Sequence, residues 1–337
     1  MNRRQALKQL VVAATACGCA ATGGTSQKGS RPRPKREVSM ETYTFKQVGD
    51  CAIKLDVYTG APSDRLRPII VTIHGGALIM GARYPIQMDV FRPLLDKGFA
   101  VVSIDYRLAP ETKLPEIIKD VQDAFAWVRE QGPDLFDGNP DQIGVQGGSA
   151  GGYLTLMTGF CIQPRPKVLV SFYGYGDIVG DWYSKPDPFY CTKPMVSKEA
   201  AMSAVGEGTP CGNPQGSRRG DFYLYCRQHG LWPNEVMGLD PNTAPDAFVP
   251  YCPAKNVTAA YPPTLLAHGT ADTDVPYAQS VQMAGALQKA GVEHELITLE
   301  GAGHGFSSAK PQDYKNVRDR TIAFLIQHLT EGGPRKA

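Results

Sequence analysis

The sequence lacks several features that would assign a chain to one of the special classes of protein. Its apolar run near the amino terminus, residues 10–16, is shorter than the ~20 residues that a transmembrane helix needs. Neither sign of charge dominates: the net charge is +2, and residues 38–337 carry 27 basic and 32 acidic residues, which does not indicate a nucleic-acid-binding surface. No cysteine or histidine spacing is typical of a zinc site, and no internal repeat is found. With 337 residues, 42% of them hydrophobic, the chain is long enough to bury a sizeable core.

The amino-terminal residues have the composition of an export signal. Residues 1–8 are basic and contain two adjacent arginines, and the apolar run at 10–16 ends in small residues. This order resembles a bacterial twin-arginine signal, so we expect residues 1–20 to direct export from the cytoplasm. The product would then be periplasmic, secreted or lipid-anchored, and Cys17 or Cys19 would carry the anchor in the last case.

Six cysteines follow this signal, and an even number in an exported protein is compatible with disulfide bonds. Four of them lie between residues 191 and 252, so we expect at least one bridge in that region. The sequence does not define the pairing. The six residues are Cys51, Cys161, Cys191, Cys211, Cys226 and Cys252.

Apolar runs and helical periodicities alternate along most of the remaining chain. After a hairpin at 43–58, the expected strands are 68–74, 99–105, 142–145, 167–172, 263–268 and 295–299. The expected helices are 90–95, 115–131, one that begins at 153–157, 277–290 and 313–330. Such alternation predicts an α/β fold, in which helices cover both faces of a mostly parallel central sheet.

The alternation stops between residues 175 and 260. This segment is rich in aromatic residues, glycine, proline and cysteine and has no long strand pattern. Because a structureless loop of this length is unusual in a compact domain, we expect an inserted cap over the carboxyl edge of the sheet. Its aromatic side chains line a substrate pocket or form the cap's own core. Residues 39–332 are thus predicted to be one catalytic domain with a cap, preceded by a flexible linker at 21–38.

A serine lies on a glycine-rich turn between an expected strand and an expected helix. Residues 147–151 fit the pattern G-x-S-x-G, in which the serine, here Ser149, occupies a strained turn that only small neighbours allow. A serine nucleophile needs a base, and His304 is the one histidine beyond the last expected strand apart from His328, which lies in the final helix. Asp272 and Asp274 follow the strand at 263–268 and are the nearby candidates for the acid that orients this base.

Five motifs together resemble the α/β-hydrolase esterases, near the hormone-sensitive-lipase-like and feruloyl-esterase-like branches. The motifs are His74-Gly75-Gly76, Asp105-Tyr106-Arg107-Leu108-Ala109-Pro110-Glu111, Gly147-Gly148-Ser149-Ala150-Gly151, the run from His268 to Pro276, and Gly303-His304-Gly305-Phe306. The similarity covers roughly residues 40–330, weakly across the cap. It implies an α/β-hydrolase fold and a catalytic triad of Ser149, His304 and Asp272.

The same resemblance assigns the other residues near the serine. Asp274 would then cap the helix that begins near Pro276, and Asp105 is a distant alternative acid. The oxyanion hole would use backbone amides of Gly75, Gly76, Ala77 and Ala150. Ala77 replaces the third glycine of the family's H-G-G-G motif, and its amide serves equally well if its φ is negative. His74 would fix the conformation of this loop.

These features predict a cofactor-free and metal-free serine hydrolase that cleaves carboxylic esters through an acyl-enzyme intermediate. Its substrate would be a small-molecule or polysaccharide-linked ester, with no nucleic-acid partner and no membrane contact beyond a lipid anchor. A serine peptidase of the prolyl-oligopeptidase type is the first alternative, although only about 40 residues precede the first strand, where that family carries a propeller. A non-catalytic binding lipoprotein is the second. A dienelactone-type hydrolase does not fit, because its nucleophile is cysteine.

Overall fold

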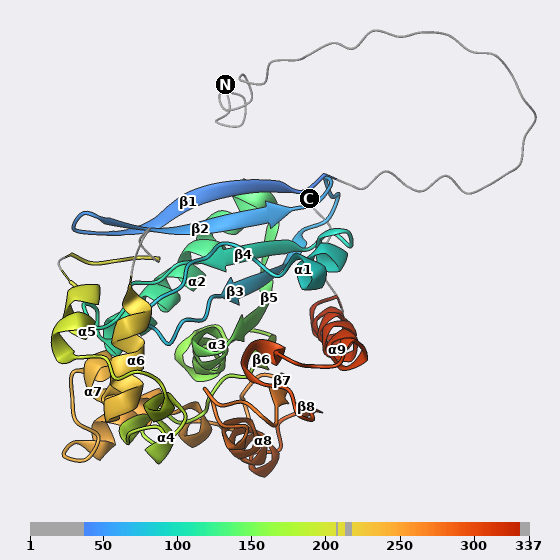
Figure 1. Cartoon of the computed structure of the whole chain (residues 1–337). Helices are drawn as coiled ribbons and strands as arrows, with labels where there is room; N and C mark the ends of the chain where they lie inside the picture. The colour runs from blue at the N-terminus through green and yellow to red at the C-terminus, as the bar shows by residue number, and fades with distance from the viewer. Residues whose placement is uncertain (1–36, 207, 213–217, 331–337) are drawn as a thin grey trace, which may run out of the picture. The chain divides into compact units, whose positions relative to one another are not determined.

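The computed structural model describes residues 37–206, 208–212 and 218–330. Within these ranges an eight-stranded sheet has the order β1-β2-β4-β3-β5-β6-β7-β8 (Figure 1). β2 pairs antiparallel with both β1 and β4, and all other neighbours are parallel, which confirms the predicted fold class. The strands are β1 (Ser39–Val48), β2 (Cys51–Thr59), β3 (Arg67–Ile73), β4 (Ala100–Ile104), β5 (Gly138–Gly148), β6 (Val168–Phe172), β7 (Thr264–Gly269) and β8 (His294–Leu299).

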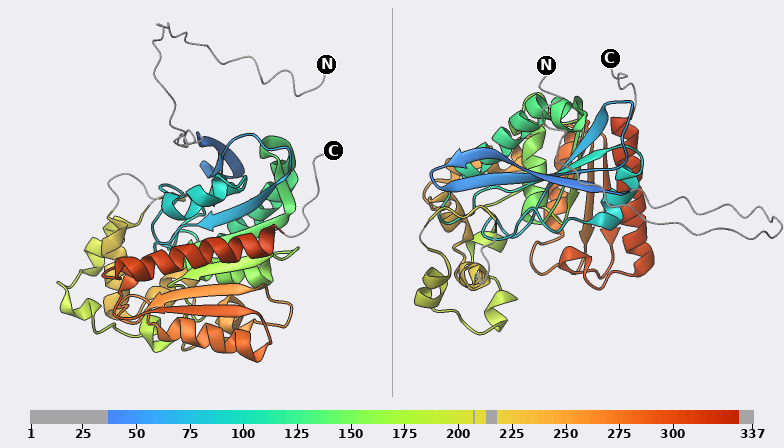
Figure 2. Two further views of the ribbon diagram at one scale, coloured as in Figure 1. Left: turned by 90° about the vertical axis from the view of Figure 1, so that its right-hand side faces the viewer. Right: turned by 90° about the horizontal axis from the view of Figure 1, so that it is seen from above.

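Helices cover both faces of this sheet, as the right-hand view in Figure 2 shows. On one face the buried side chains of α1 (Met88–Leu95) and α9 (Pro311–Leu329) form an apolar cluster with the sheet. The second cluster, on the other face, includes buried side chains of α2 (Leu114–Phe136), α3 (Ala150–Cys161) and α8 (Ala278–Lys289). Successive residues of a strand point to opposite faces, so a strand that is covered twice must be apolar throughout. β3 accordingly reads as a nearly continuous apolar run.

The segment between β6 and β7 forms the cap, for which we keep the range 175–260. Its helices are α4 (Asp181–Ser184), α5 (Lys198–Ala204), α6 (Arg219–His229) and α7 (Trp232–Met237), with 3₁₀ turns η1 (Tyr190–Thr192), η2 (Pro245–Tyr251) and η3 (Pro253–Lys255). Tyr183 stacks between Trp182 and Trp232, with ring centroids 3.7 and 4.0 Å apart. These aromatic side chains therefore form the cap's own core.

We expected at least one disulfide bond among the four cysteines that lie between residues 191 and 252, and this prediction is wrong. All six cysteines among the described residues are free thiols. Cys226 and Cys252 are fully buried and pack as apolar side chains in the core, and burial raises the pKa of Cys252 to about 11. The Cys211 thiol lies 3.3 Å from the carbonyl oxygen of Ala52 and makes a hydrogen bond with the Cys51 thiol. Cys226 and Cys252 therefore contribute to the packing of the core, and no cysteine among the described residues is cross-linked.

The predicted export signal at 1–20, with Cys17 and Cys19, lies outside the described residues, as does nearly all of the linker predicted at 21–38. Both stay predictions. In the part of the chain that the structure describes, no helix has the length and apolarity needed to cross a membrane.

Candidate active site

Ser149 occupies a sharp turn between β5 and α3, at the carboxyl edge of the sheet. Its backbone has φ 56° and ψ −126°, a conformation that L residues rarely adopt. A Cβ on Gly147 would lie 2.3 Å from the carbonyl oxygen of Gly151, and a Cβ on Gly151 would lie 2.0 Å from that of Ile73. Only glycine fits at either position, so the glycines of the motif permit the turn that exposes the serine.

The loop after β3 packs directly against this turn. A Cβ on Gly75 would lie only 2.9 Å from the carbonyl oxygen of Gly148, so the two backbones are in close contact. The Gly76 carbonyl accepts hydrogen bonds from the amides of Ile79 and Met80, both at 2.9 Å, which makes a tight turn. Ala77 has φ 55°, so the negative φ given above as the condition for its amide to act as a donor is not met. Within the described residues, the amides of Gly75, Gly76 and Ala77 donate to no other protein group.

Buried side chains hold this loop in place. The Nδ1 atom of His74 donates to the Gly75 carbonyl at 2.8 Å, and its ring stacks on Tyr106 with centroids 4.2 Å apart. Burial lowers the pKa of His74, so the ring is neutral and serves as a structural element. From the cap, the indole Nε1 of Trp232 donates to the Ala77 carbonyl at 2.9 Å. The loop is therefore fixed by the domain on one side and by the cap on the other.

Asp272 and His304 form a hydrogen-bonded pair on the loops that follow β7 and β8. The Nδ1 atom of His304 lies 2.8 Å from Oδ2 of Asp272, and Oδ1 of Asp272 accepts from the amides of Asp274 and Val275 at 2.8 and 2.9 Å. His268, which is fully buried, places its Nε2 3.2 Å from the same carboxylate. Burial would raise the pKa of Asp272, but the hydrogen bonds from His268 and His304 prevail and hold it well below its usual value. Asp272 is therefore a charged, fixed acceptor for His304.

The second nitrogen of His304 faces another carboxylate. His304 opens the 3₁₀ turn η4 (His304–Phe306), and its Nε2 lies 3.4 Å from Oδ2 of Asp274. Burial opposes protonation of the ring, but the Asp272 hydrogen bond and the charge of Asp274 outweigh it and raise the pKa of His304. The prediction that Asp274 caps a helix is wrong: α8 begins at Ala278 without a side-chain cap, and Asp274 is instead paired with Arg227 of the cap.

Ser149, His304 and the loop after β3 line one cavity of about 460 Å³. Among the described residues, the Ser149 hydroxyl makes no hydrogen bond to His304, which is common for catalytic pairs without substrate. Asp105, the distant alternative acid, binds Arg83 at 2.6 Å instead of a catalytic histidine. Further polar side chains on the cavity wall come from Asp274, from Tyr223 of the cap, and from Thr72, His74, Arg83, Gln87, Ser103, Gln146 and Tyr173.

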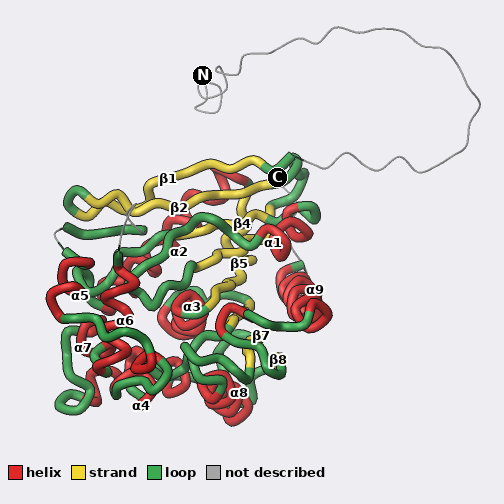
Figure 3. The backbone as a smooth tube through the Cα atoms, viewed as in Figure 1, coloured by secondary structure: helices red, strands yellow, loops and turns green. Residues whose placement is uncertain are grey.

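The direction of the strands explains why Ser149, Asp272, His304 and the loop after β3 lie close together. β3, β5, β7 and β8 are parallel, so the loops at their carboxyl ends share one edge of the sheet. Figure 3 distinguishes the loops, in green, from the strands, in yellow. Sequence reasoning missed the contacts of His268 with Asp272 and of Arg227 with Asp274. His268 opens the motif that runs to Pro276, but the motif was interpreted only for its acid, and Arg227 belongs to no motif. In the described ranges no group of three or more histidine, cysteine, aspartate or glutamate side chains is arranged to hold a metal ion.

Two parts of the chain match known protein families. Residues 55–173, which include Ser149, match the family described as BD-FAE. Residues 221–332, which include Asp272 and His304, match the prolyl oligopeptidase family. Each match covers about a third of the chain.

Among curated proteins, the non-reducing polyketide synthase mapC' of Penicillium brevicompactum is 29% identical over 346 residues, covering 88% of this chain and 16% of the synthase. The 5-methylorsellinic acid synthase of Aspergillus terreus is 28% identical over 354 residues, covering 89% of this chain and 14% of that protein. The chain thus spans about a sixth of the length of the curated relatives it matches.

Three solved structures have a similar fold. An α/β-hydrolase superfamily protein from Enterococcus faecalis aligns with a TM-score of 0.67 at 22% identity, covering 86% of this chain and 99% of that one. Thermogutta terrifontis esterase 2 phosphoramylated by tabun gives 0.59 at 22% identity, covering 88% and 97%. The butyrate-bound form of that esterase gives 0.56 at 24% identity, covering 89% and 97%. At these identities the similarity concerns the fold.

Proposed function

We propose that this chain, an α/β hydrolase by fold, cleaves carboxylic esters with Ser149 as nucleophile, His304 as base and Asp272 as the acid that orients the base. One observation carries the proposal: the strained turn presents Ser149 in the same cavity as a histidine that is hydrogen-bonded to a buried, ionised carboxylate. A binding protein has no need of that combination, so the geometry favours an enzyme over the binding lipoprotein.

The proposed reaction begins with proton transfer. Neutral His304 takes the proton of the Ser149 hydroxyl on Nε2 while the serine oxygen attacks the ester carbonyl carbon. Asp272 keeps the other proton on Nδ1 and stabilises the imidazolium that forms. His304 then gives its proton to the departing alcohol, which leaves an acyl-enzyme, and a water activated by the same histidine hydrolyses that intermediate.

The negative oxygen of the tetrahedral intermediate needs preset donors. We assign this role to the amides of Gly75, Gly76, Ala77 and Ala150, and we keep Ala77 despite its positive φ because its amide has no other acceptor among the described residues. Ala150 is the first residue of α3, so its amide has no acceptor within the helix and lies at the positive end of the helix dipole. The amides of the loop donate to no other described group. Losing one such donor typically costs ~2.7–4 kcal/mol of transition-state stabilisation.

The comparisons support an ester over an amide substrate, because one of the proteins with a similar fold is described as an esterase and one of its structures has butyrate bound. The match of residues 221–332 to the prolyl oligopeptidase family favours a serine peptidase as the second candidate. A panel of acyl esters and of proline-containing peptides with the same reporter group separates the two.

We further propose that the enzyme is exported and acts on small-molecule or polysaccharide-linked esters. The basic, apolar sequence at residues 1–20 and the polar wall of the cavity are the observations behind this proposal. A panel of graded acyl esters, with acetylated xylan and methyl ferulate, tests the substrate class.

Replacement of Ser149 by alanine tests the nucleophile. We expect Ser149→Ala to lower kcat for short p-nitrophenyl esters by at least ~10³-fold and to abolish labelling by a fluorophosphonate, because both reactions need the serine oxygen. Ser203→Ala, on the exposed face of α5, is the matched control and should keep both activities. Unchanged ester turnover in Ser149→Ala would remove the proposed nucleophile.

A further inference from the structure

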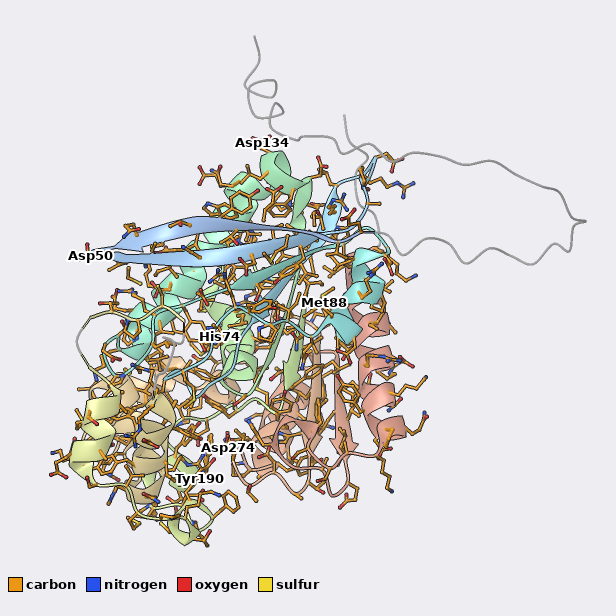
Figure 4. The ribbon with its side chains drawn as sticks, turned by 45° about the horizontal axis from the view of Figure 1, so that its top comes forward. Asp50, His74, Met88, Asp134, Tyr190 and Asp274 are labelled. Atoms are coloured by element: carbon orange, nitrogen blue, oxygen red, sulfur yellow. The ribbon has the colours of Figure 1, made fainter. Side chains whose placement is uncertain are left out.

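Asp274 joins the catalytic histidine to the cap. Its Oδ2 lies 3.4 Å from Nε2 of His304, while its Oδ1 accepts hydrogen bonds from three groups of the cap. These are the Tyr190 hydroxyl at 2.8 Å, the Arg227 guanidinium at 2.7 Å and the Tyr223 hydroxyl. Figure 4 shows Asp274 beside Tyr190, at the boundary between the cap and the strand ends. One carboxylate thus contacts the cap with one oxygen and the histidine with the other.

Arg227 is built into the cap as a fixed cation. Its side chain is 1% exposed and also binds Asp187 at 2.6 Å. The guanidinium lies over the rings of Tyr190 and Tyr183, 4.5 and 4.9 Å from their centroids. A buried guanidinium needs carboxylate partners, so Arg227 fixes Asp274 in position and neutralises part of its charge.

The position of Asp274 matters because a carboxylate can only accept a hydrogen bond. Nδ1 of His304 carries a proton for Asp272, so neutral His304 presents a lone pair to Asp274, and this contact is repulsive. The imidazolium presents an N–H instead, and the contact becomes attractive. Asp274 therefore favours the charged form of His304, which arises when Ser149 loses its proton.

We propose that Asp274 is a positioning residue that stabilises the His304 imidazolium during acyl transfer, and that Arg227 couples this effect to the cap. The inference rests on the proposed roles of Ser149 and His304. The groups that face His304 are the carboxylates of Asp272 and Asp274, the Arg227 guanidinium and the ring of Tyr173, 4.9 Å away between centroids. Asp274 is the member of this set whose removal takes away negative charge at Nε2 and leaves the Asp272 hydrogen bond in place.

The direct test is an NMR titration of His304 in the full-length protein. In the wild type, the pKa lies above the usual ~6.5 because of the two carboxylates. Asp274→Asn should lower it by about one unit, since a nearby opposite charge typically contributes ~1–3 units. Asp187→Asn is the matched control: it removes the other carboxylate partner of Arg227 but does not contact His304, so its shift should be much smaller.

Kinetics give a second readout. The acid limb of kcat/KM follows the ionisation of the free enzyme, so it should move to lower pH in Asp274→Asn and stay nearly unchanged in Asp187→Asn. Above both pKa values, kcat of Asp274→Asn should fall about tenfold, because one pKa unit corresponds to a factor of ~10, with little change in KM. A purely structural role would lower the melting temperature without moving the acid limb.

Equal shifts in the two asparagine variants, or no shift in Asp274→Asn, would overturn the proposal. If Asp274→Asn fails to fold, Tyr190→Phe replaces it: loss of the hydroxyl that donates to Asp274 leaves more negative charge on the carboxylate oxygens, and the His304 pKa should rise. An unchanged or lowered pKa there would also contradict the role. The titration needs no turnover, so it decides on Asp274 even if Ser149→Ala disproves the esterase.

Discussion

The turn that carries Ser149 and the loop that carries His304 are fixed by different means. Around Ser149 the contacts are between backbone atoms: Gly147 and Gly151 leave no room for a Cβ, and the closest neighbours belong to the same turn or to the adjacent β3. Around His304 the contacts are between side chains that come from distant segments, including Asp272 and the Asp274–Arg227 pair. The serine thus depends on local chain geometry, whereas the histidine depends on the assembled cap.

Loss of the cap cation should have the largest effect on stability. Arg227→Met leaves Asp187 and Asp274 without their shared guanidinium, and breaking a buried pair in this way typically costs about 3–5 kcal/mol. We expect urea denaturation to show a loss at the lower end of that range, because both carboxylates reach water in part. Arg320→Met breaks the exposed pair with Glu295 and should cost at most about 1 kcal/mol. A similar loss in both variants would show that the cap pair is not structural.

Added bulk in the serine turn should have the next largest effect. Gly151→Ala puts a Cβ 2.0 Å from the Ile73 carbonyl, which only a backbone shift can relieve, so we expect a loss of about 3 kcal/mol. Gly285→Ala, on the exposed side of α8, is the control, because its Cβ meets nothing within 4 Å. It should stabilise the protein by ~0.5–1 kcal/mol through helix propensity. Thermal denaturation of both variants checks the prediction, and a stable, active Gly151→Ala enzyme would contradict it.

Removal of one indole donor should have the smallest effect of the three. Trp232→Phe leaves the buried Ala77 carbonyl without its partner, which adds about 1–2 kcal/mol to the cost of truncation and lowers kcat by loosening the loop after β3. Trp182→Phe is the control, since its Nε1 has no partner in the described structure although its ring stacks on Tyr183. Unfolding free energies and kcat for both variants should separate the hydrogen bond from the stacking. Equal effects on kcat would argue against a role for the indole hydrogen bond.

Much of the fold was predictable from the sequence because its signals are local. Buried parallel strands are apolar throughout, and helices repeat their apolar residues every three to four positions. The prediction for α2 ended too early, at residue 131, whereas the helix continues through Gly132 and Pro133 to Phe136. There the ring of Phe136 lies over Gly132, and the Asp137 amide donates to the Gly132 carbonyl, so an i,i+4 contact within the helix and a C-cap extend it past its breakers.

The candidate site was predictable in part. Ser149, Asp272 and His304 occur in motifs at strand ends, and the fold brings Asp272 and His304 into contact and places Ser149 in the cavity that His304 lines. The partner of Asp274 was not predictable: Arg227 is 47 residues away in the sequence, on a helix where an arginine is ordinarily a surface residue. The cysteines gave the wrong indication for a similar reason, because composition does not distinguish a buried thiol from a bridged one.

Two neighbouring helices of the cap contact both halves of the proposed catalytic apparatus. α7 provides Trp232 to the loop of the proposed oxyanion donors, and α6 provides Arg227 to the carboxylate beside the proposed base. On this proposal, displacement of the helix pair would disengage anion binding and proton transfer in one movement. An engineered exchange of caps between such proteins would alter the turnover number together with substrate choice, unless the indole and the guanidinium were transplanted in register.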